Sequence, residues 1–220
     1  MRLISNIDKI NKPQRVLPSG LLSLNEAFIF YIVLTILSIL VSSFINFNAF
    51  IIVSIASTVL FLYSYRLKKI SLVGNITVAF LTGLVFIFGG VVVENPSAAI
   101  IPSLFAFFIN LIRELVKDMQ DVEGDKGAGI ITFPIKFGFL RTKYLMLIPS
   151  VILIIMTTIP FIYEIYKIEY FVVVMVIVNP LLIFTIKKLF DDDSLKNLIK
   201  ISNLLKLNMI FGLIAIFLGK

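Results

Sequence analysis

The sequence predicts an all-α fold, a polytopic membrane bundle of about seven transmembrane helices, and three observations support this prediction. Hydrophobic residues make up 59% of the 220-residue chain, whereas charged residues make up only 15%. The mean hydropathy is +1.05, which is typical of an integral membrane protein rather than of a soluble domain. Apolar runs of about 20 residues, the length that crosses a bilayer, recur along the chain.

Seven such runs follow one another without a low-complexity linker, so a single domain over residues 1–220 is expected. In chain order, the predicted helices are 26–46, 48–64, 72–93, 98–117, 142–163, 168–188 and 202–219. Basic residues mark every second boundary: Lys9, Lys12 and Arg15 precede the first run, Arg66, Lys68 and Lys69 follow the second, Arg113 to Lys143 follow the fourth, and Lys187, Lys188, Lys196 and Lys200 follow the sixth.

The other loops carry almost no positive charge. The loops 46–48, 94–96 and 163–169 hold Lys167 as their only basic residue. Because cytoplasmic loops of membrane proteins are enriched in lysine and arginine, the N-terminus is expected inside and the C-terminus outside. The sequence therefore predicts a multi-pass cell-membrane protein whose charged motifs all open on the cytoplasmic face.

The composition also limits the chemistry. The chain has no cysteine and no histidine, which excludes disulfides, thiolate metal sites and the commonest general base. The formal net charge of +7 is explained by the positive-inside bias and by anionic lipid headgroups. Membrane lipids are therefore expected partners, and nucleic acid is not.

The segment 112–138 carries the strongest functional signal. Asp118, Asp121 and Asp125 are spaced at i, i+3 and i+7 after an apolar run, so on one continuous helix they fall within about 60° of one face. Carboxylates are costly near lipid, and a shared divalent cation is the simplest compensation. Without further motifs, a solvated loop that neutralises its own lysines explains the three aspartates about as well.

Two other segments lie at the same predicted face. Residues 5–20, S-N-I-D-K-I-N-K-P-Q-R-V-L-P-S-G, contain Asp8, and residues 63–75, Y-S-Y-R-L-K-K-I-S-L-V-G-N, form a basic loop between two helices. The charge bias predicts that the loops near Asp8, Lys68 and Asp118 converge. Alternative interpretations are an ordinary polar N-terminus for Asp8 and a topology signal for Arg66 and Lys68.

Together the three segments resemble the UbiA family of intramembrane prenyltransferases. That family has a loop N-D-x-x-D-x-x-x-D before a Pro-Ser-Gly turn, a Y-S-x-x-L-K loop, and a second aspartate loop after R-E-x-x-K-D. The sequence R-E-L-V-K-D-M-Q-D-V-E-G-D is most similar to that of the archaeal branch that makes digeranylgeranylglyceryl phosphate. The resemblance covers essentially the whole chain and implies a nine-helix fold, of which seven helices are found here.

The resemblance also places two family helices and two motif aspartates before or at the start of this chain. Aligned on Asp8, those aspartates fall on Met1 and Ile4. Either the gene start lies too far downstream or after a frameshift, or the chain is a decayed paralogue. With one carboxylate in place of three, the activity of the chain as written is expected to be low.

The resemblance implies a Mg²⁺-dependent transfer of a geranylgeranyl group from its diphosphate to a lipid acceptor, geranylgeranylglyceryl phosphate in the archaeal branch. The implied metal ligands are Asp118, Asp121, Asp125 and Asp8, the implied diphosphate-binding residues are Arg66, Lys68, Lys117, Tyr63 and Asn75, and the implied catalytic residues are the three clustered aspartates with Lys68. Mg²⁺ prefers oxygen ligands, and fixed positive charges stabilise a departing diphosphate.

Other functions stay open at this point. Related scaffolds also prenylate aromatic, quinone and haem-precursor acceptors. A non-catalytic bundle descended from the family, or a transporter, is a further alternative, although a transporter would carry charges or broken helices at mid-membrane depth. Asn75, Asn110 and Asn179 fit hydrogen bonds between helices equally well, and the run Asp191–Asp193 fits a solvated linker.

Overall fold

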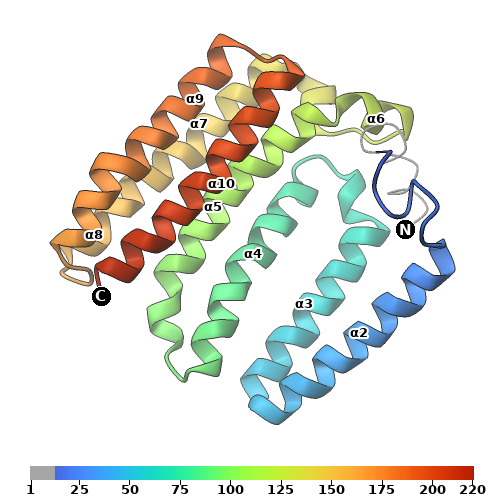
Figure 1. Ribbon diagram of the computed structural model, residues 1–220, viewed down its shortest axis with the longest axis horizontal. Coiled ribbons are helices and arrows are strands. Elements are labelled where there is room, and N and C mark those ends of the chain that lie inside the picture. Colours follow the sequence, from blue (N-terminus) through green and yellow to red (C-terminus); the bar gives the residue numbers. More distant parts are fainter. Residues whose placement is uncertain (1–12) are drawn as a thin grey trace.

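The computed structural model describes residues 13–220, and over this range the chain forms helices and turns without a strand. The long helices lie side by side and run between two ends of the molecule (Figure 1). In chain order, the elements are α2 (Leu24–Ile45), α3 (Phe47–Tyr65), η1 (Leu67–Lys69), α4 (Val73–Val92), α5 (Pro96–Gln120), α6 (Val122–Gly127), α7 (Phe133–Ile162), α8 (Ile168–Val173), η2 (Val174–Val178), α9 (Asn179–Asp191) and α10 (Leu195–Leu218).

Seven of the described helical segments are long and apolar enough to cross a membrane, which confirms the predicted number. The sixth of them is composite, because α8, the π-helical turn η2 and α9 run on as one span over Ile168–Asp191. Asn208 Nδ2 donates to the Val178 carbonyl at 3.0 Å, so α10 supplies a donor to a carbonyl within the irregular turn.

Two helices have starts that differ from the hydropathy prediction. α7 starts at Phe133, but non-helical geometry at Gly138 separates this first segment from the span predicted to start at 142, and α10 starts at Leu195 rather than 202. In α10 the Ser194 hydroxyl accepts a hydrogen bond from the Asn197 backbone N–H at 3.3 Å, which is a helix N-cap. Hydropathy detects the apolar part of a helix and misses a polar first turn.

The apolar core is centred on α5, which packs against α4, α7 and α10. Ile112 and Val116 on α5 are fully buried, as are Met146 on α7 and Leu205 on α10. The α4–α5 contact is especially close, because a Cβ at Gly83 would lie 2.9 Å from the Ser103 carbonyl oxygen. A glycine at this crossing lets two membrane helices approach within van der Waals contact.

α2 and α3 lie on the outer side of the bundle (Figure 1) and bury few side chains. Phe44 is 88% exposed and Phe30 is 64% exposed. A continuous apolar surface of this extent is unfavourable in water and is expected where helices face lipid.

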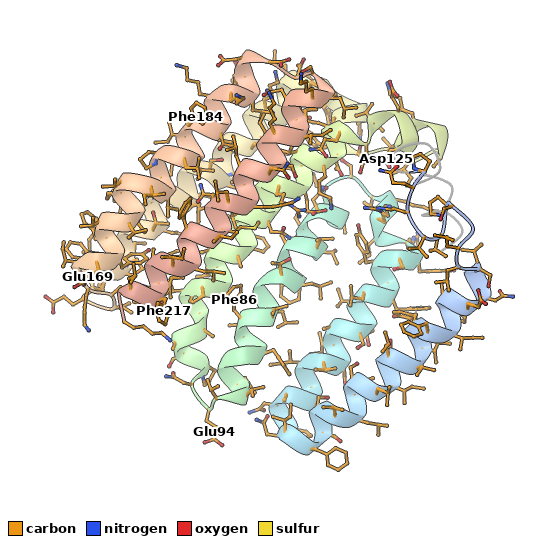
Figure 2. All side chains as sticks on the ribbon, in the orientation of Figure 1. Phe86, Glu94, Asp125, Glu169, Phe184 and Phe217 are labelled. Carbon is orange, nitrogen blue, oxygen red and sulfur yellow. The ribbon has the colours of Figure 1, made fainter. Side chains whose placement is uncertain are left out.

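The two ends of the bundle differ in the loops and charged residues that they hold. We call the end that holds η1, α6 and the α9–α10 connection the α6 end. Asp125 lies there, whereas Glu94 and Glu169 lie at the opposite end (Figure 2). The predicted convergence of the loops near Lys68 and Asp118 is confirmed by the cavity described below, and Asp8 lies outside the described residues.

Candidate active site

A small polar cavity of about 40 Å³ opens among the loops of the α6 end. Its lining residues come from seven parts of the chain: Tyr63 of α3, Lys68 of η1, Ile70 and Ser71 of the following connection, Gly74 and Asn75 of α4, Glu114 and Asp118 of α5, Asp125 of α6, and Ile130 and Thr132 of the connection to α7. Carboxylates, one ammonium, one phenol and two hydroxyls therefore share one space at the membrane boundary.

Asp118 is held in place by α4. Asn75 Nδ2 donates to Asp118 Oδ2 at 2.9 Å, and Asn75 is itself buried. This bond links the first turn of α4 to the last turn of α5. A carboxylate fixed by a second side chain in this way presents its other oxygen in a defined direction.

Asp125 reaches the same cavity by a different route from the one its spacing predicts. α5 ends at Gln120, Asp121 takes a non-helical ψ of 9° as the cap, and α6 starts at Val122. The prediction that the three aspartates share one face of a single helix is therefore wrong. Asp118 and Asp125 still line one cavity, whereas Asp121 is half-buried outside it.

The aspartates do not form a compact three-carboxylate cluster. Within residues 13–220, no group of three or more acidic side chains is arranged to hold a metal ion by itself. Asp121 and Asp125 are not free groups, because each interacts with other parts of the protein. The predicted metal role of Asp118, Asp121 and Asp125 stays a prediction.

Glu114 is a cavity residue to which the sequence analysis assigned no role. It lies one turn before Asp118 on α5 and is 6% exposed. Lys117 Nζ lies 2.8 Å from Glu114 Oε1, and Arg113 Nη1 lies 3.4 Å from the same oxygen. The i, i+4 spacing of Glu114 and Asp118 was a signal that could have found it.

The predicted basic residues divide into two groups. Lys68 lines the cavity, and so do Tyr63 and Asn75. Lys117 is bound to Glu114 and is not among the lining residues, and Arg66 is exposed at the C-cap of α3. Among the described residues, the structure thus brings together Lys68, Tyr63 and Asn75 but not Arg66 or Lys117.

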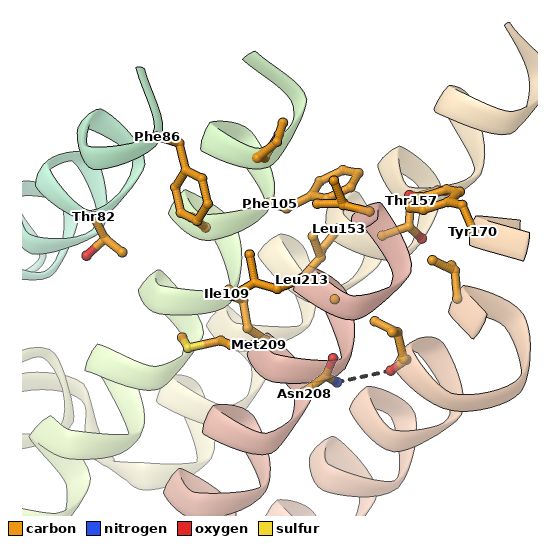
Figure 3. Close-up of a pocket in the computed structure, with 16 residues that line it drawn as sticks. Thr82, Phe86, Phe105, Ile109, Leu153, Thr157, Tyr170, Asn208, Met209 and Leu213 are labelled. Carbon is orange, nitrogen blue, oxygen red and sulfur yellow. Dashed lines mark hydrogen bonds between the residues drawn. The ribbon is translucent and has the colours of Figure 1, made fainter. Parts of the chain in front are cut away.

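A second cavity, of about 240 Å³, lies deeper in the bundle and is almost wholly apolar. Phe86 of α4, Phe105 of α5, Leu153 of α7, Tyr170 of α8 and Leu213 of α10 are among its lining residues (Figure 3). The few polar groups at its wall are satisfied internally. For example, the Tyr170 hydroxyl donates to the Thr157 carbonyl at 2.8 Å.

The two cavities follow each other along α4 and α5. Asn75 lines the polar cavity and Thr82 the apolar one, and seven helical residues span about 10 Å. Between them, Asn110 Nδ2 donates to Thr82 Oγ1 at 2.7 Å. This bond supports the interhelical interpretation of Asn110, as the Asn179–Thr157 contact of 3.2 Å does for Asn179.

The acidic run after α9 is separate from both cavities. Asp192 accepts hydrogen bonds from the Ser194 backbone N–H and hydroxyl, both at 2.8 Å, and these bonds hold the pKa of Asp192 below its ordinary value. Asp193 pairs with Lys143 Nζ at 3.0 Å. The linker interpretation of this run is confirmed for Asp192 and Asp193.

Comparison with known proteins identifies relatives that match nearly the whole chain. The family model described as the UbiA prenyltransferase family matches residues 5–210. Digeranylgeranylglyceryl phosphate synthase of Methanocaldococcus jannaschii is 38% identical over 217 residues, which cover 97% of this chain and 75% of the relative. The synthase of Methanosphaera stadtmanae is 32% identical over 213 residues, with 97% and 78% covered.

Solved structures share the fold. A structure of digeranylgeranylglyceryl phosphate synthase superimposes with a TM-score of 0.79 at 37% identity, covering 99% of this chain and 79% of the other. A UbiA homologue from Archaeoglobus fulgidus bound to GPP and Mg²⁺ superimposes with a TM-score of 0.63 at 21% identity, covering 98% and 80%. At that identity the second likeness concerns the fold alone.

Proposed function

The chain belongs to the UbiA prenyltransferase family, and from this premise we propose that it transfers a geranylgeranyl group from its diphosphate to geranylgeranylglyceryl phosphate, with Mg²⁺ as cofactor. The two relatives described above, which are 32% and 38% identical, carry the name digeranylgeranylglyceryl phosphate synthase. The acceptor is assigned from those relatives, because neither cavity by itself distinguishes a lipid hydroxyl from an aromatic ring.

The observation that carries the proposal is the stacking of two unlike cavities along α4 and α5. The polar cavity offers carboxylates and an ammonium at the membrane boundary, and the apolar cavity extends into the bundle below it. A prenyl diphosphate has the same division, with a multiply charged head on a long apolar chain. The head is expected among Lys68, Asp118 and Asp125, and the chain beside Phe86 and Phe105.

The residues at the polar cavity fit Mg²⁺. This ion keeps several waters and usually takes one or two carboxylates together with substrate phosphate oxygens, so a three-carboxylate cage is unnecessary. Asp118 and Asp125 supply carboxylates from two different helices to one space. Bound there, Mg²⁺ would neutralise charge on the diphosphate as its bond to the allylic carbon breaks.

The remaining cavity residues have roles that follow from their chemistry. Lys68 supplies a fixed positive charge to the departing diphosphate. Asn75 orients Asp118 through its 2.9 Å hydrogen bond. Lys117 and Arg113 offset the charge of buried Glu114, so that carboxylate is expected to position its neighbours rather than bind metal.

The apolar cavity has a protective role in this proposal. An allylic cation is quenched by water, and a cavity walled by Phe86, Phe105 and Leu153 excludes it. The Tyr170 and Asn208 polar groups at that wall are already bonded to backbone carbonyls. They are therefore poorly placed to hold a water beside the reacting carbon.

We also propose that the α6 end faces the cytoplasm. The basic residues Lys68, Lys126 and Lys188 lie at this end or in its loops, whereas the opposite end has Lys167 and the terminal Lys220. The positive-inside bias supports this orientation, which would give the site access to cytosolic prenyl diphosphate.

The test is transfer of radiolabelled geranylgeranyl groups by the purified chain in lipid. Labelled product should form, at the low rate expected from the sequence, with geranylgeranylglyceryl phosphate and Mg²⁺, and chelation should abolish it. An aromatic acid offered as acceptor should give none. Product with the aromatic acid alone would refute the acceptor, and transfer that persists in a chelator would refute the metal dependence.

A further inference from the structure

Two hydroxyl groups in the polar cavity lack a hydrogen-bond partner. In the part of the chain that the structure describes, three buried side-chain N or O atoms have no partner: Ser71 Oγ, Thr132 Oγ1 and Arg113 Nε. Two of these three line the same 40 Å³ cavity. Since buried polar groups are nearly always hydrogen-bonded, two orphans in one small space indicate a ligand that completes them.

Thr132 departs from the usual behaviour of its position. It is the N-cap residue of α7, where a threonine hydroxyl ordinarily accepts a bond from the helix's second or third N–H. Here the side chain makes no capping bond, although the residue is only 7% exposed. Pro134, two residues on, has no N–H to offer. The hydroxyl is thus left available to the cavity.

Ser71 lines the same cavity from the connection between η1 and α4. The next residue, Leu72, has a φ of +65°, a left-handed conformation that leucine rarely adopts. Leu72 also packs against the main apolar core. This anchored, strained residue fixes the turn that carries Ser71 beside Lys68 and Gly74.

The chemistry of the other lining groups indicates what the hydroxyls bind. Asp118, Asp125 and Glu114 offer acceptors when ionised, and the Asn75 amide already donates to Asp118. A phosphate held near these carboxylates by a cation needs donors for its outer oxygens. Ser71 and Thr132 are uncommitted donors on the cavity wall.

We propose that the Ser71 and Thr132 hydroxyls donate hydrogen bonds to phosphate oxygens of the substrate and so form a hydroxyl clamp on its charged head. The clamp rests on the proposed function, since it presumes that a phosphorylated substrate enters the polar cavity. The phosphate belongs either to the prenyl diphosphate or to the acceptor. In either case, the carboxylates of α5 and α6 line the same cavity, where they suit a metal-bound diphosphate.

The experiment measures ligand affinity and ligand-free stability in the full chain. Thr132→Val is isosteric and removes an unpaired hydroxyl, so the ligand-free thermal midpoint should stay equal or rise. Its affinity for inorganic pyrophosphate with Mg²⁺ should fall about tenfold, and that of Ser71→Ala similarly, because each loses a hydrogen bond to a charged group. Thr132→Ser should restore binding.

A matched control is Thr142→Val. That hydroxyl is fully buried and donates to the Gly138 carbonyl at 2.8 Å, so its loss should lower the thermal midpoint and leave pyrophosphate affinity unchanged. Glycerol phosphate serves as the second ligand. A loss confined to pyrophosphate assigns the clamp to the diphosphate, and a loss confined to glycerol phosphate assigns it to the acceptor.

The clamp and the proposed function fail in different ways. One set of results would overturn only the clamp. In it, the wild-type chain binds pyrophosphate with Mg²⁺, Asp118→Asn abolishes this binding, and Thr132→Val and Ser71→Ala bind pyrophosphate and glycerol phosphate as tightly as wild type. If the wild-type chain binds neither ligand, both are overturned. A drop in ligand-free stability of Thr132→Val equal to that of Thr142→Val would also overturn the clamp, because the hydroxyl would then have a protein partner.

Discussion

Lys68 and Lys117 have the same side chain and lie at the same end of the bundle, yet their surroundings differ. Lys68 lines the polar cavity, and over residues 13–220 no acidic side chain forms an ion pair with it. Lys117 Nζ contacts both carboxylate oxygens of Glu114, at 2.8 and 3.0 Å. The family resemblance implied that both lysines bind the diphosphate, and the structure gives a physical reason to separate them.

Lys68→Met should therefore weaken the binding of Mg²⁺ and pyrophosphate about tenfold, the effect of one charge-assisted contact. Lys117→Met should change this affinity by less than about threefold, but lower stability by about 1 kcal/mol, because buried Glu114 loses its partner while the lysine is partly exposed. Calorimetry and thermal unfolding measure the two effects. Equal losses of affinity would contradict the separation.

Individual site residues were predictable to different degrees. Asp118, Lys68, Tyr63 and Asn75 were identified from motif resemblance, and all four line one cavity. Ser71 and Thr132 were missed because a hydroxyl's function depends on whether the backbone already occupies it, and no spacing reveals that. Glu114 was missed although its i, i+4 relation to Asp118 was visible.

At the scale of elements, apolar length predicted all seven spans, while irregular geometry was not predicted. The break after Gln120 arises at polar residues that hydropathy treats as a simple loop, and it moves Asp121 away from the cavity. The short α6 then returns Asp125 to it. A face calculated from 100° per residue fails at such a break because the helix axis changes direction.

Gly138 is the hinge that lets the start of α7 depart from the rest of that helix. Its φ of 82° and ψ of 166° lie in a region that is nearly confined to glycine. The segment before this kink carries Thr132 to the polar cavity. If α7 were straight, its first segment would place Thr132 away from the polar cavity.

Gly138→Ala should accordingly destabilise the chain by about 1–3 kcal/mol, the cost of forcing a Cβ into this backbone region. Gly89→Ala is the matched control, because Gly89 lies within α4 with open space around it and should gain up to about 1 kcal/mol from alanine's helix propensity. Thermal unfolding of both variants in the same detergent measures their stabilities. A neutral Gly138→Ala would show that the kink is not required.

For the whole molecule, charge bias and motif order together predicted that the functional loops meet at one end, and the described loops do so. The existence of a separate apolar cavity was not predictable, since it depends on how side chains from six elements leave space. Periodicity identifies which face of a helix is apolar, but it does not show how completely neighbouring side chains fill the space beside that face.

Orientation in the membrane can be tested because the chain has no cysteine. Lys126→Cys lies at the α6 end and Glu169→Cys at the opposite end, and both positions are exposed. A membrane-impermeant maleimide should label Glu169→Cys in intact cells and Lys126→Cys only after permeabilisation. The reverse pattern would place the polar cavity on the outer face.

The central claim is that the polar cavity at the α6 end binds the diphosphate of a prenyl substrate through Mg²⁺ and its carboxylates. The most direct measurement is equilibrium binding of labelled geranylgeranyl diphosphate, with and without Mg²⁺, by Asp118→Ala, Asp125→Ala and Asp192→Ala. We expect the first two to abolish Mg²⁺-dependent binding and Asp192→Ala to retain it, because Asp192 lies outside the cavity and is bonded to Ser194. Binding that survives in Asp118→Ala and Asp125→Ala, or that is weakened equally in Asp192→Ala, would contradict the account.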